Sequence, residues 1–97
     1  MRKLPDIPSV IHAPAGPVEV RWDYVDEETD GEWDPEQRVI VLDPTLSMDA
    51  AWLVFLHEKV HVFLDDVGVK LEDSVLEQVC NAVALGWIHE QWQDVLA

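Results

Sequence analysis

Residues 48–64, MDAAWLVFLHEKVHVFL, decide the fold of this chain. Wound as a helix, the stretch is apolar on nearly every side, so we expect a central helix that is buried by the rest of the protein. Ser47 is placed to cap its start, with Asp49 in the first turn. The helix should run to about Asp66, because Gly68 is placed to terminate it.

Two stretches before this helix have the patterns of β-strands. VEVRWDYV, residues 18–25, alternates apolar and polar side chains, and RVIVLDP, residues 38–44, is a β-branched run that stops at Asp43-Pro44. An acidic, turn-rich segment, DEETDGEWDPEQ, lies between them, so we expect an antiparallel hairpin with a long connection. Residues 1–17 carry four of the six prolines and are expected to form an extended N-terminal arm.

A second helix is expected to begin between Lys70 and Ser74 and to continue towards the C-terminus. Its apolar residues recur at helical spacing and predict a face that packs on the first helix: Leu76, Val79, Val83, Trp87 and Trp92. The 97 residues are therefore predicted to form a single α+β domain (residues 1–97), in which a small antiparallel sheet is followed by two helices.

The composition argues against several classes of partner. The chain carries 20 acidic and 6 basic residues, a formal net charge of -14, which disfavours binding to nucleic acid or to an anionic membrane. No apolar run is long enough to span a bilayer, and the first residues lack the apolar segment of a signal peptide. The single cysteine, Cys80, fits a reducing compartment, so we expect a cytoplasmic protein.

The central helix contains the motif HExxH, as His57, Glu58 and His61. Residues four apart lie on the same side of a helix, so the two imidazoles can reach one Zn²⁺. Glu58 is close enough to accept a proton from an activated water without being a ligand, which is the role of a general base in metallopeptidases. The alternative is a pair of core histidines beside a surface glutamate, but charged residues inside so apolar a helix are costly unless they are paired or bind metal.

A catalytic zinc requires a third protein ligand, and the second helix offers Glu72, Asp73 and Glu77. We favour Glu77, because it lies next to the apolar face that should pack on the first helix. Asn81, one turn further, is placed to hydrogen-bond a ligand histidine. The alternative is a capping box from Ser74 to Glu77, which requires the second helix to begin at Ser74.

These residues resemble a known group of proteins. LHEKVHVF, followed by EQVCNAVA at residues 77–84, is similar to the ImmA/IrrE-type metallopeptidases, in which HExxH is followed on the next helix by a pattern close to E-x-x-A-N-x-F-A. Glu77, Asn81 and Ala84 match that pattern, whereas Cys80 and Val83 replace its first alanine and its phenylalanine. The resemblance covers roughly residues 38–85, and the length of the chain suits the minigluzincins.

The resemblance implies a gluzincin site, with His57, His61 and Glu77 on zinc and Glu58 as the general base. It also implies a small sheet above the zinc whose edge strand binds an extended peptide. The expected function is a zinc endopeptidase that cleaves a protein or peptide, such as a transcriptional regulator. Lys59 departs from the pattern, since the first x of the motif is usually apolar or small, and we expect it either to pair with a carboxylate or to mark altered activity.

Two other classes of function remain open. One is a non-catalytic, zinc-stabilised acidic module that binds a protein, and the other is an acidic mimic of nucleic acid, which would have no use for a buried HExxH. The stabiliser of the oxyanion is not identifiable, and Tyr24 and His89 are candidates by residue type alone.

The roles of three further features stay open. His12 is a solvated side chain or an arm ligand over the zinc, and Cys80 is a small core residue or a thiolate ligand. The loop at residues 26–36 is a solvated connection or a selector of basic substrates.

Overall fold

The computed structural model describes residues 4–96, and the side chains of residues 4–91. Four strands precede two helices, which confirms the predicted α+β class: β1 (Val10–Ala13), β2 (Gly16–Trp22), β3 (Gly31–Asp34), β4 (Val39–Leu42), α1 (Met48–Val67) and α2 (Asp73–Leu96). Neither helix, over the residues described, has both the length and the apolar character that crossing a bilayer requires.

The sheet is mixed, with the strand order β1-β2-β4-β3. The two strands predicted from their patterns, β2 and β4, lie side by side but run parallel, with Val20 opposite Ile40. The expected antiparallel hairpin between them is therefore wrong. The reason is β3, which follows β2 in the chain but lies at the edge of the sheet, one strand away from β2. β4 then enters between β2 and β3 and runs antiparallel to β3.

The two edge strands lie in segments where no strand was expected. β1 falls within the predicted extended arm and pairs antiparallel with the start of β2, with Ile11 opposite Val18. β3, with the sequence GEWD, falls within the acidic connection. Both strands are four residues long and lack an alternating pattern, so they form because β2 and β4 offer partners for their backbone groups.

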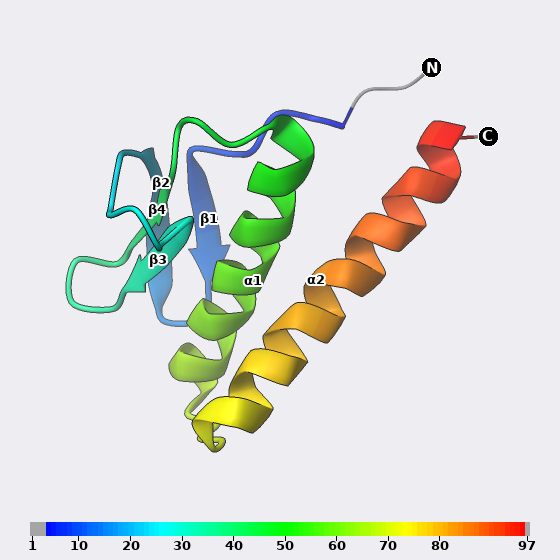
Figure 1. Cartoon of the computed structure of the whole chain (residues 1–97). Helices are drawn as coiled ribbons and strands as arrows, with labels where there is room; N and C mark the ends of the chain where they lie inside the picture. The colour runs from blue at the N-terminus through cyan, green and yellow to red at the C-terminus, as the bar shows by residue number, and fades with distance from the viewer. Residues whose placement is uncertain (1–3, 97) are drawn as a thin grey trace.

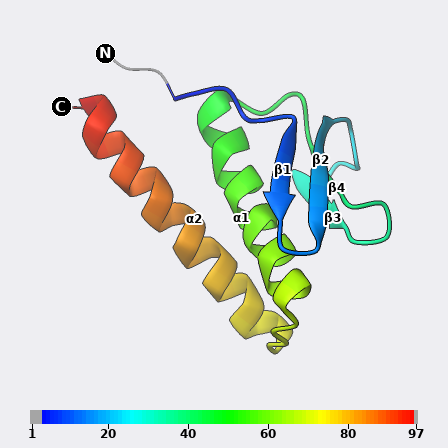
Figure 2. The ribbon, with the colours of Figure 1, turned by 180° about the vertical axis from the view of Figure 1, so that it is seen from behind.

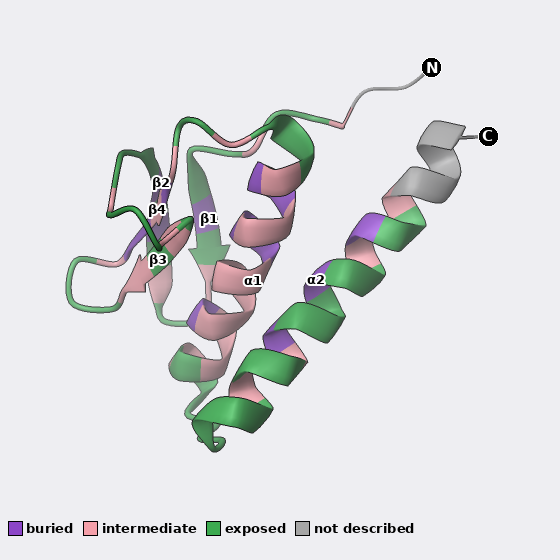
Figure 3. Cartoon of the chain, viewed as in Figure 1, coloured by how far each residue is buried: buried purple, intermediate pink, exposed green. Residues whose placement is uncertain are grey.

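Helix α1 lies between the sheet and α2, as the two opposite views show (Figures 1 and 2). Among the described elements, α1 contacts β1, β3, β4 and α2, whereas α2 contacts α1 alone. Val18, Ile40, Phe55 and Val62 are fully buried in the core between the sheet and α1. The outer face of α2 is exposed over most of its described length (Figure 3).

The ends of α1 are as the sequence predicts. Ser47 Oγ accepts a hydrogen bond from the Ala50 amide at 3.3 Å, which caps the first turn. At the other end Gly68 has a φ of 76°, and its amide donates to the Asp65 carbonyl at 3.1 Å. This left-handed conformation favours glycine and closes the helix.

Helix α2 begins within the predicted interval, but the face that packs on α1 differs slightly from the predicted face. Cys80, Ala84 and Ile88 are buried against α1, while Val83, which was expected on this face, is 51% exposed. Trp87 packs as predicted, stacked on Trp52 with ring centroids 4.8 Å apart. Trp92 lies outside the described side chains.

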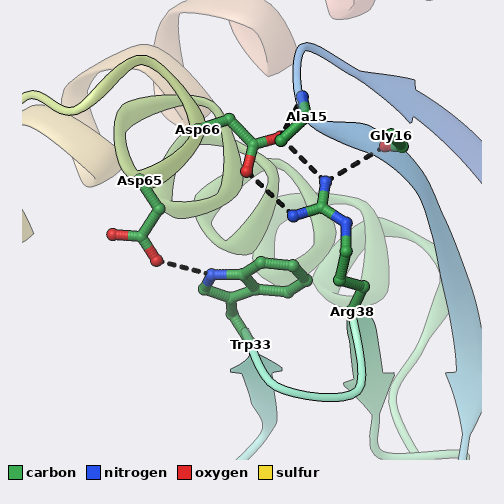
Figure 4. A network of polar contacts seen from close by, with 6 residues as sticks. All are labelled: Ala15, Gly16, Trp33, Arg38, Asp65 and Asp66. Carbon is green, nitrogen blue, oxygen red and sulfur yellow. Dashed lines mark hydrogen bonds and ion pairs between the residues drawn. The ribbon is translucent and has the colours of Figure 1, made fainter.

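A polar network ties the sheet to the C-terminal end of α1 (Figure 4). Arg38 donates two hydrogen bonds to the Asp66 carboxylate, at 2.9 and 2.8 Å, and a third to the Gly16 carbonyl. The same carboxylate accepts a bond from the Ala15 amide at 3.0 Å. These contacts hold together the β1–β2 turn, the β3–β4 turn and α1.

Trp33, in β3, extends this network along α1. Its ring nitrogen donates a hydrogen bond of 2.7 Å to the Asp65 carboxylate, and the Arg38 guanidinium lies over its ring, 5.6 Å from the centroid. We refer to the Arg38–Asp66 and Trp33–Asp65 contacts together as the Arg38 clamp. The clamp fixes the edge strand β3 against α1.

Candidate metal centre

Helix α1 presents His57 and His61 on the side that faces α2, because four residues span slightly more than one turn. Helix α2 brings the carboxylate of Glu77 to both rings. The Nε2 atoms of the two histidines are 3.2 Å apart, and Glu77 oxygens lie 3.0 Å from His57 Nε2 and 3.2 Å from His61 Nε2. Two nitrogens and a carboxylate therefore converge within one small region.

Asn81 fixes the orientation of one histidine. Its side-chain oxygen lies 2.8 Å from His57 Nδ1. An amide oxygen accepts hydrogen bonds, so His57 donates from Nδ1, and its other ring nitrogen, Nε2, faces His61 and Glu77. The sequence predicts this hydrogen bond between Asn81 and a histidine of the HExxH motif.

The distances in this group fit a tetrahedral metal ion. Bonds of about 2.0–2.1 Å to nitrogen and about 2.0–2.2 Å to oxygen place the ligand atoms of such an ion roughly 3.3 Å apart. The observed separations of 3.0–3.2 Å are close to that value. We call His57, His61, Glu77 and Asn81 the histidine–glutamate cluster, and its donor atoms match those that bind Zn²⁺.

The start of α2 decides between the two interpretations of Glu77. The helix begins at Asp73, and the Leu76 amide donates to the Glu72 carbonyl at 2.8 Å, so Glu72 and not Ser74 is the residue that precedes the first turn. The capping box is thus absent at Ser74, and Glu77 lies inside the helix. Glu72 and Asp73, the other two candidates, are exposed at the start of α2.

Glu58 lies in a cleft beside the cluster. The cleft has a volume of about 440 Å³ and is lined by residues 28–31 of the acidic loop, by Leu53 and Val54 of α1, and by His57, Glu58, Glu77 and Asn81. Burial raises the pKa of the Glu58 carboxyl; the neighbouring histidines oppose the rise, and the Glu77 and Glu32 carboxylates add to it. The predicted general base thus shares one open cavity with two of the three predicted metal ligands, His57 and Glu77.

Cys80, which the sequence left open between a core residue and a thiolate ligand, lies beside the two histidines. It is fully buried, and its sulfur and a ring nitrogen of each histidine form a group whose atoms all lie within 4.8 Å of one another. Burial, and to a smaller extent the Glu77 and Glu58 carboxylates, together raise the pKa of its thiol to about 11. The spacing of Cys80, three residues after Glu77 on the same helix, was the available signal.

Other candidate residues lie elsewhere. Tyr24 is 60% exposed, and His89 is exposed at the edge of a separate cavity, so neither lines the cleft that contains Glu58. His12 is exposed in β1, at the opposite edge of the sheet from β3. Lys59 places its ammonium group near the rings of Phe55 and Phe63, 6.0 and 5.9 Å from their centroids.

The cleft is also lined by a glycine, Gly31, that no sequence motif predicts. Gly31 begins β3 at the cleft, where a Cβ atom would lie 2.5 Å from Val54 Cγ1 of α1 and 3.1 Å from the Val41 carbonyl oxygen. Glycine therefore allows the edge strand to approach the helix that carries the HExxH residues.

Comparison with known proteins adds no relative. No protein-family model matches the chain, and neither the curated proteins nor the solved structures yielded a match.

Proposed function

We propose that this protein is a zinc-dependent endopeptidase of the gluzincin type, as its resemblance to the ImmA/IrrE-type metallopeptidases implies. The observation that carries the proposal is the convergence of His57, His61 and Glu77 beside a cleft that also contains Glu58. The donor atoms lie at the separations of tetrahedral ligands, and the cleft leaves room for a peptide next to them.

In this proposal His57, His61 and Glu77 hold the zinc ion. When bound, zinc acts as a Lewis acid that polarises water and the carbonyl group of the substrate. Glu58 accepts a proton from the attacking water, whose oxygen forms a bond to the carbonyl carbon. Glu58 then delivers that proton to the nitrogen of the leaving amine as the carbon–nitrogen bond breaks.

The edge strand β3 supplies a place for the substrate backbone. It is the last strand of the described sheet, and its first residue, Gly31, lines the same cleft as Glu58. An extended peptide can add to such an edge through backbone hydrogen bonds, which do not depend on sequence. The Arg38 clamp fixes β3 against α1. Because Glu58 lies on α1, the clamp also fixes this strand edge relative to Glu58.

The partner is proposed to be a protein or peptide, by family resemblance a transcriptional regulator, and the reaction is placed in the cytoplasm. The carboxylates of Glu28 and Asp30 belong to the loop that lines the cleft. They favour a substrate segment that carries Lys or Arg near the bond that is cut. The buried Cys80 thiol is compatible with a reducing compartment.

The experiment compares wild type with Glu58→Gln on a peptide library, after zinc reconstitution and metal analysis. We expect about one zinc per chain in both proteins and a loss of hydrolysis of about 10²–10⁴-fold in the variant, because the proton acceptor is gone. Glu72→Gln is the matched control, since Glu72 is exposed at the start of α2 and outside the cleft. A protein that resists zinc reconstitution, or a variant as active as wild type, would reject the proposal.

A non-catalytic, zinc-stabilised acidic module is the second candidate, and the position of Cys80 favours it. Four protein ligands produce a closed structural site, which stabilises a fold and leaves no position for water. This candidate predicts zinc binding without hydrolysis of any library peptide, in wild type and in Glu58→Gln alike. Cleavage by wild type alone would exclude it.

A further inference from the structure

A fourth candidate ligand approaches the histidine–glutamate cluster from the protein interior. Cys80 exposes none of its surface, and it belongs to the group of three ligand atoms within 4.8 Å that also includes His57 and His61. We infer that the Cys80 thiolate is a fourth protein ligand of the metal and closes the centre in the resting protein. This inference rests on the proposed function and concerns its regulation.

The geometry requires only a small adjustment. A sulfur at about 2.3 Å and a nitrogen at about 2.0–2.1 Å from one tetrahedral ion lie roughly 3.6 Å apart. The separations in the group reach no more than 4.8 Å, so the sulfur must move by on the order of 1 Å.

The ligands approach from complementary sides. Glu77 exposes 55% of its side chain and lines the cleft, whereas Cys80 is buried in the contact between the two helices and is not part of the cleft lining. Glu77 and Cys80 are three residues apart on α2, so both face α1. A carboxylate from the solvent side and a sulfur from the interior can therefore complete the set begun by the two histidines.

Coordination by Cys80 would have two chemical consequences. As the sulfur–metal bond forms, the thiol gives its proton to solvent, and the reverse occurs when the bond breaks. The sulfur competes for the position that the proposed reaction needs, so wild type should turn over more slowly than it would without Cys80. A thiolate also makes the site select zinc over the hard cations Mg²⁺ and Ca²⁺.

Titration with Co²⁺, followed by absorption spectroscopy, tests the inference. A cobalt–thiolate bond produces a charge-transfer band in the near ultraviolet, and tetrahedral cobalt also absorbs in the visible range. We expect both features in wild type, and loss of the charge-transfer band in Cys80→Ala and Cys80→Ser. Serine has the shape of cysteine with a smaller terminal atom, and matching circular dichroism of the metal-free proteins shows that the fold is retained.

The outcomes separate this inference from the proposed function. Visible cobalt bands without a charge-transfer band in wild type would overturn the inference and leave the site of two histidines and a glutamate intact. Absence of cobalt binding in every variant would overturn both. The closing role has its own test, because Cys80→Ala loaded with zinc should cut library peptides faster than wild type, and an unchanged or lower rate would overturn that role.

Discussion

Helix α1 carries two polar clusters that differ in the charges of their groups. The Arg38 clamp, at its C-terminal end, joins opposite charges, since the guanidinium of Arg38 meets the Asp66 carboxylate at 2.8 and 2.9 Å. The histidine–glutamate cluster, further towards the start of the helix, brings two imidazoles and a carboxylate to within 3.0–3.2 Å of one another. The first cluster contains a permanent cation, and the second contains imidazole and carboxylate groups of the kinds that bind zinc.

The two clusters also differ in how their carboxylates are paired. In the clamp each carboxylate oxygen of Asp66 receives a donor from Arg38, and one also receives the Ala15 amide. In the histidine–glutamate cluster the Asn81 side-chain oxygen contacts His57 Nδ1, so His57 Nε2 faces His61 and Glu77, and burial raises the pKa of the nearby Glu58 carboxyl. Imidazole nitrogens and carboxylates are groups that bind a divalent cation. The clamp is a structural element, and the cluster is the candidate metal site.

The largest effect should come from adding zinc to wild type. A ligand that binds the folded state and not the unfolded state raises the free energy of unfolding. For zinc at a free concentration 100 to 1,000 times its dissociation constant, we expect a rise of about 2.7 to 4.1 kcal/mol. His61→Ala should remove this response, because it deletes a nitrogen of the cluster and leaves the clamp intact. Urea unfolding with zinc or with a chelator measures the change.

Calcium at the same concentration is the matched control for that measurement. The surface of a chain with a net charge of -14 attracts any divalent cation, but calcium prefers oxygen ligands and should not use the imidazoles. An equal rise with calcium, or an equal zinc response in His61→Ala, would show that the histidine–glutamate cluster is not the binding site, and the contrast between the two clusters would break.

The next effect concerns the strand that connects the two regions. β3 begins at the cleft with Gly31 and reaches the Arg38 clamp with Trp33. Gly31→Ala places a methyl group 2.5 Å from Val54 Cγ1, so β3 or the valine must shift. We expect a loss of about 1–3 kcal/mol in the free energy of unfolding, by overpacking.

Val54→Ala in the same chain should recover part of that loss, because it removes the atom that the new methyl group meets. Thermal or urea unfolding of the two single variants and the double variant measures the coupling. If the two changes in the free energy of unfolding are strictly additive, Gly31 and Val54 do not interact. The close contact of β3 with α1 at the cleft then does not hold the strand in place.

Much of the fold and part of the site follow from local sequence. The ends of α1 are set by Ser47 and Gly68, and the alternating and β-branched patterns locate β2 and β4. Helical spacing alone brings His57 and His61 to one side. These features depend on residues within a turn or a strand of one another, which is why a pattern can predict them.

The remainder depends on contacts between distant segments. The parallel pairing of β2 with β4 follows from the insertion of β3, whose sequence, GEWD, has no strand pattern of its own. The position of Glu77 depends on α2 starting at Asp73 rather than at Ser74. Cys80 looked like a packing residue, and only the approach of the two helices places its sulfur near both histidines.

The smallest effect is the response of the Arg38 clamp to acid. The hydrogen bonds from Arg38, and then the bond from the Ala15 amide, hold the pKa of Asp66 below its ordinary value of 3.8. A carboxyl whose pKa is lower in the folded state contributes stability above the unfolded value, and that stability is lost as the pH falls through the folded value. The contribution of Asp66 should therefore be constant near neutral pH and disappear below pH 3.8.

The measurement is the difference in melting temperature between wild type and Asp66→Asn across this range of pH. The difference is needed because protonation of the other carboxylates relieves repulsion in so acidic a chain and shifts both proteins together. Glu36→Gln, at an exposed position on the β3–β4 turn, is the matched control. The difference in melting temperature between wild type and this variant should not become smaller in acid. A gap between wild type and Asp66→Asn that persists unchanged into acid would mean that the clamp is held by packing. In that case the pairing of opposite charges would no longer distinguish it from the histidine–glutamate cluster.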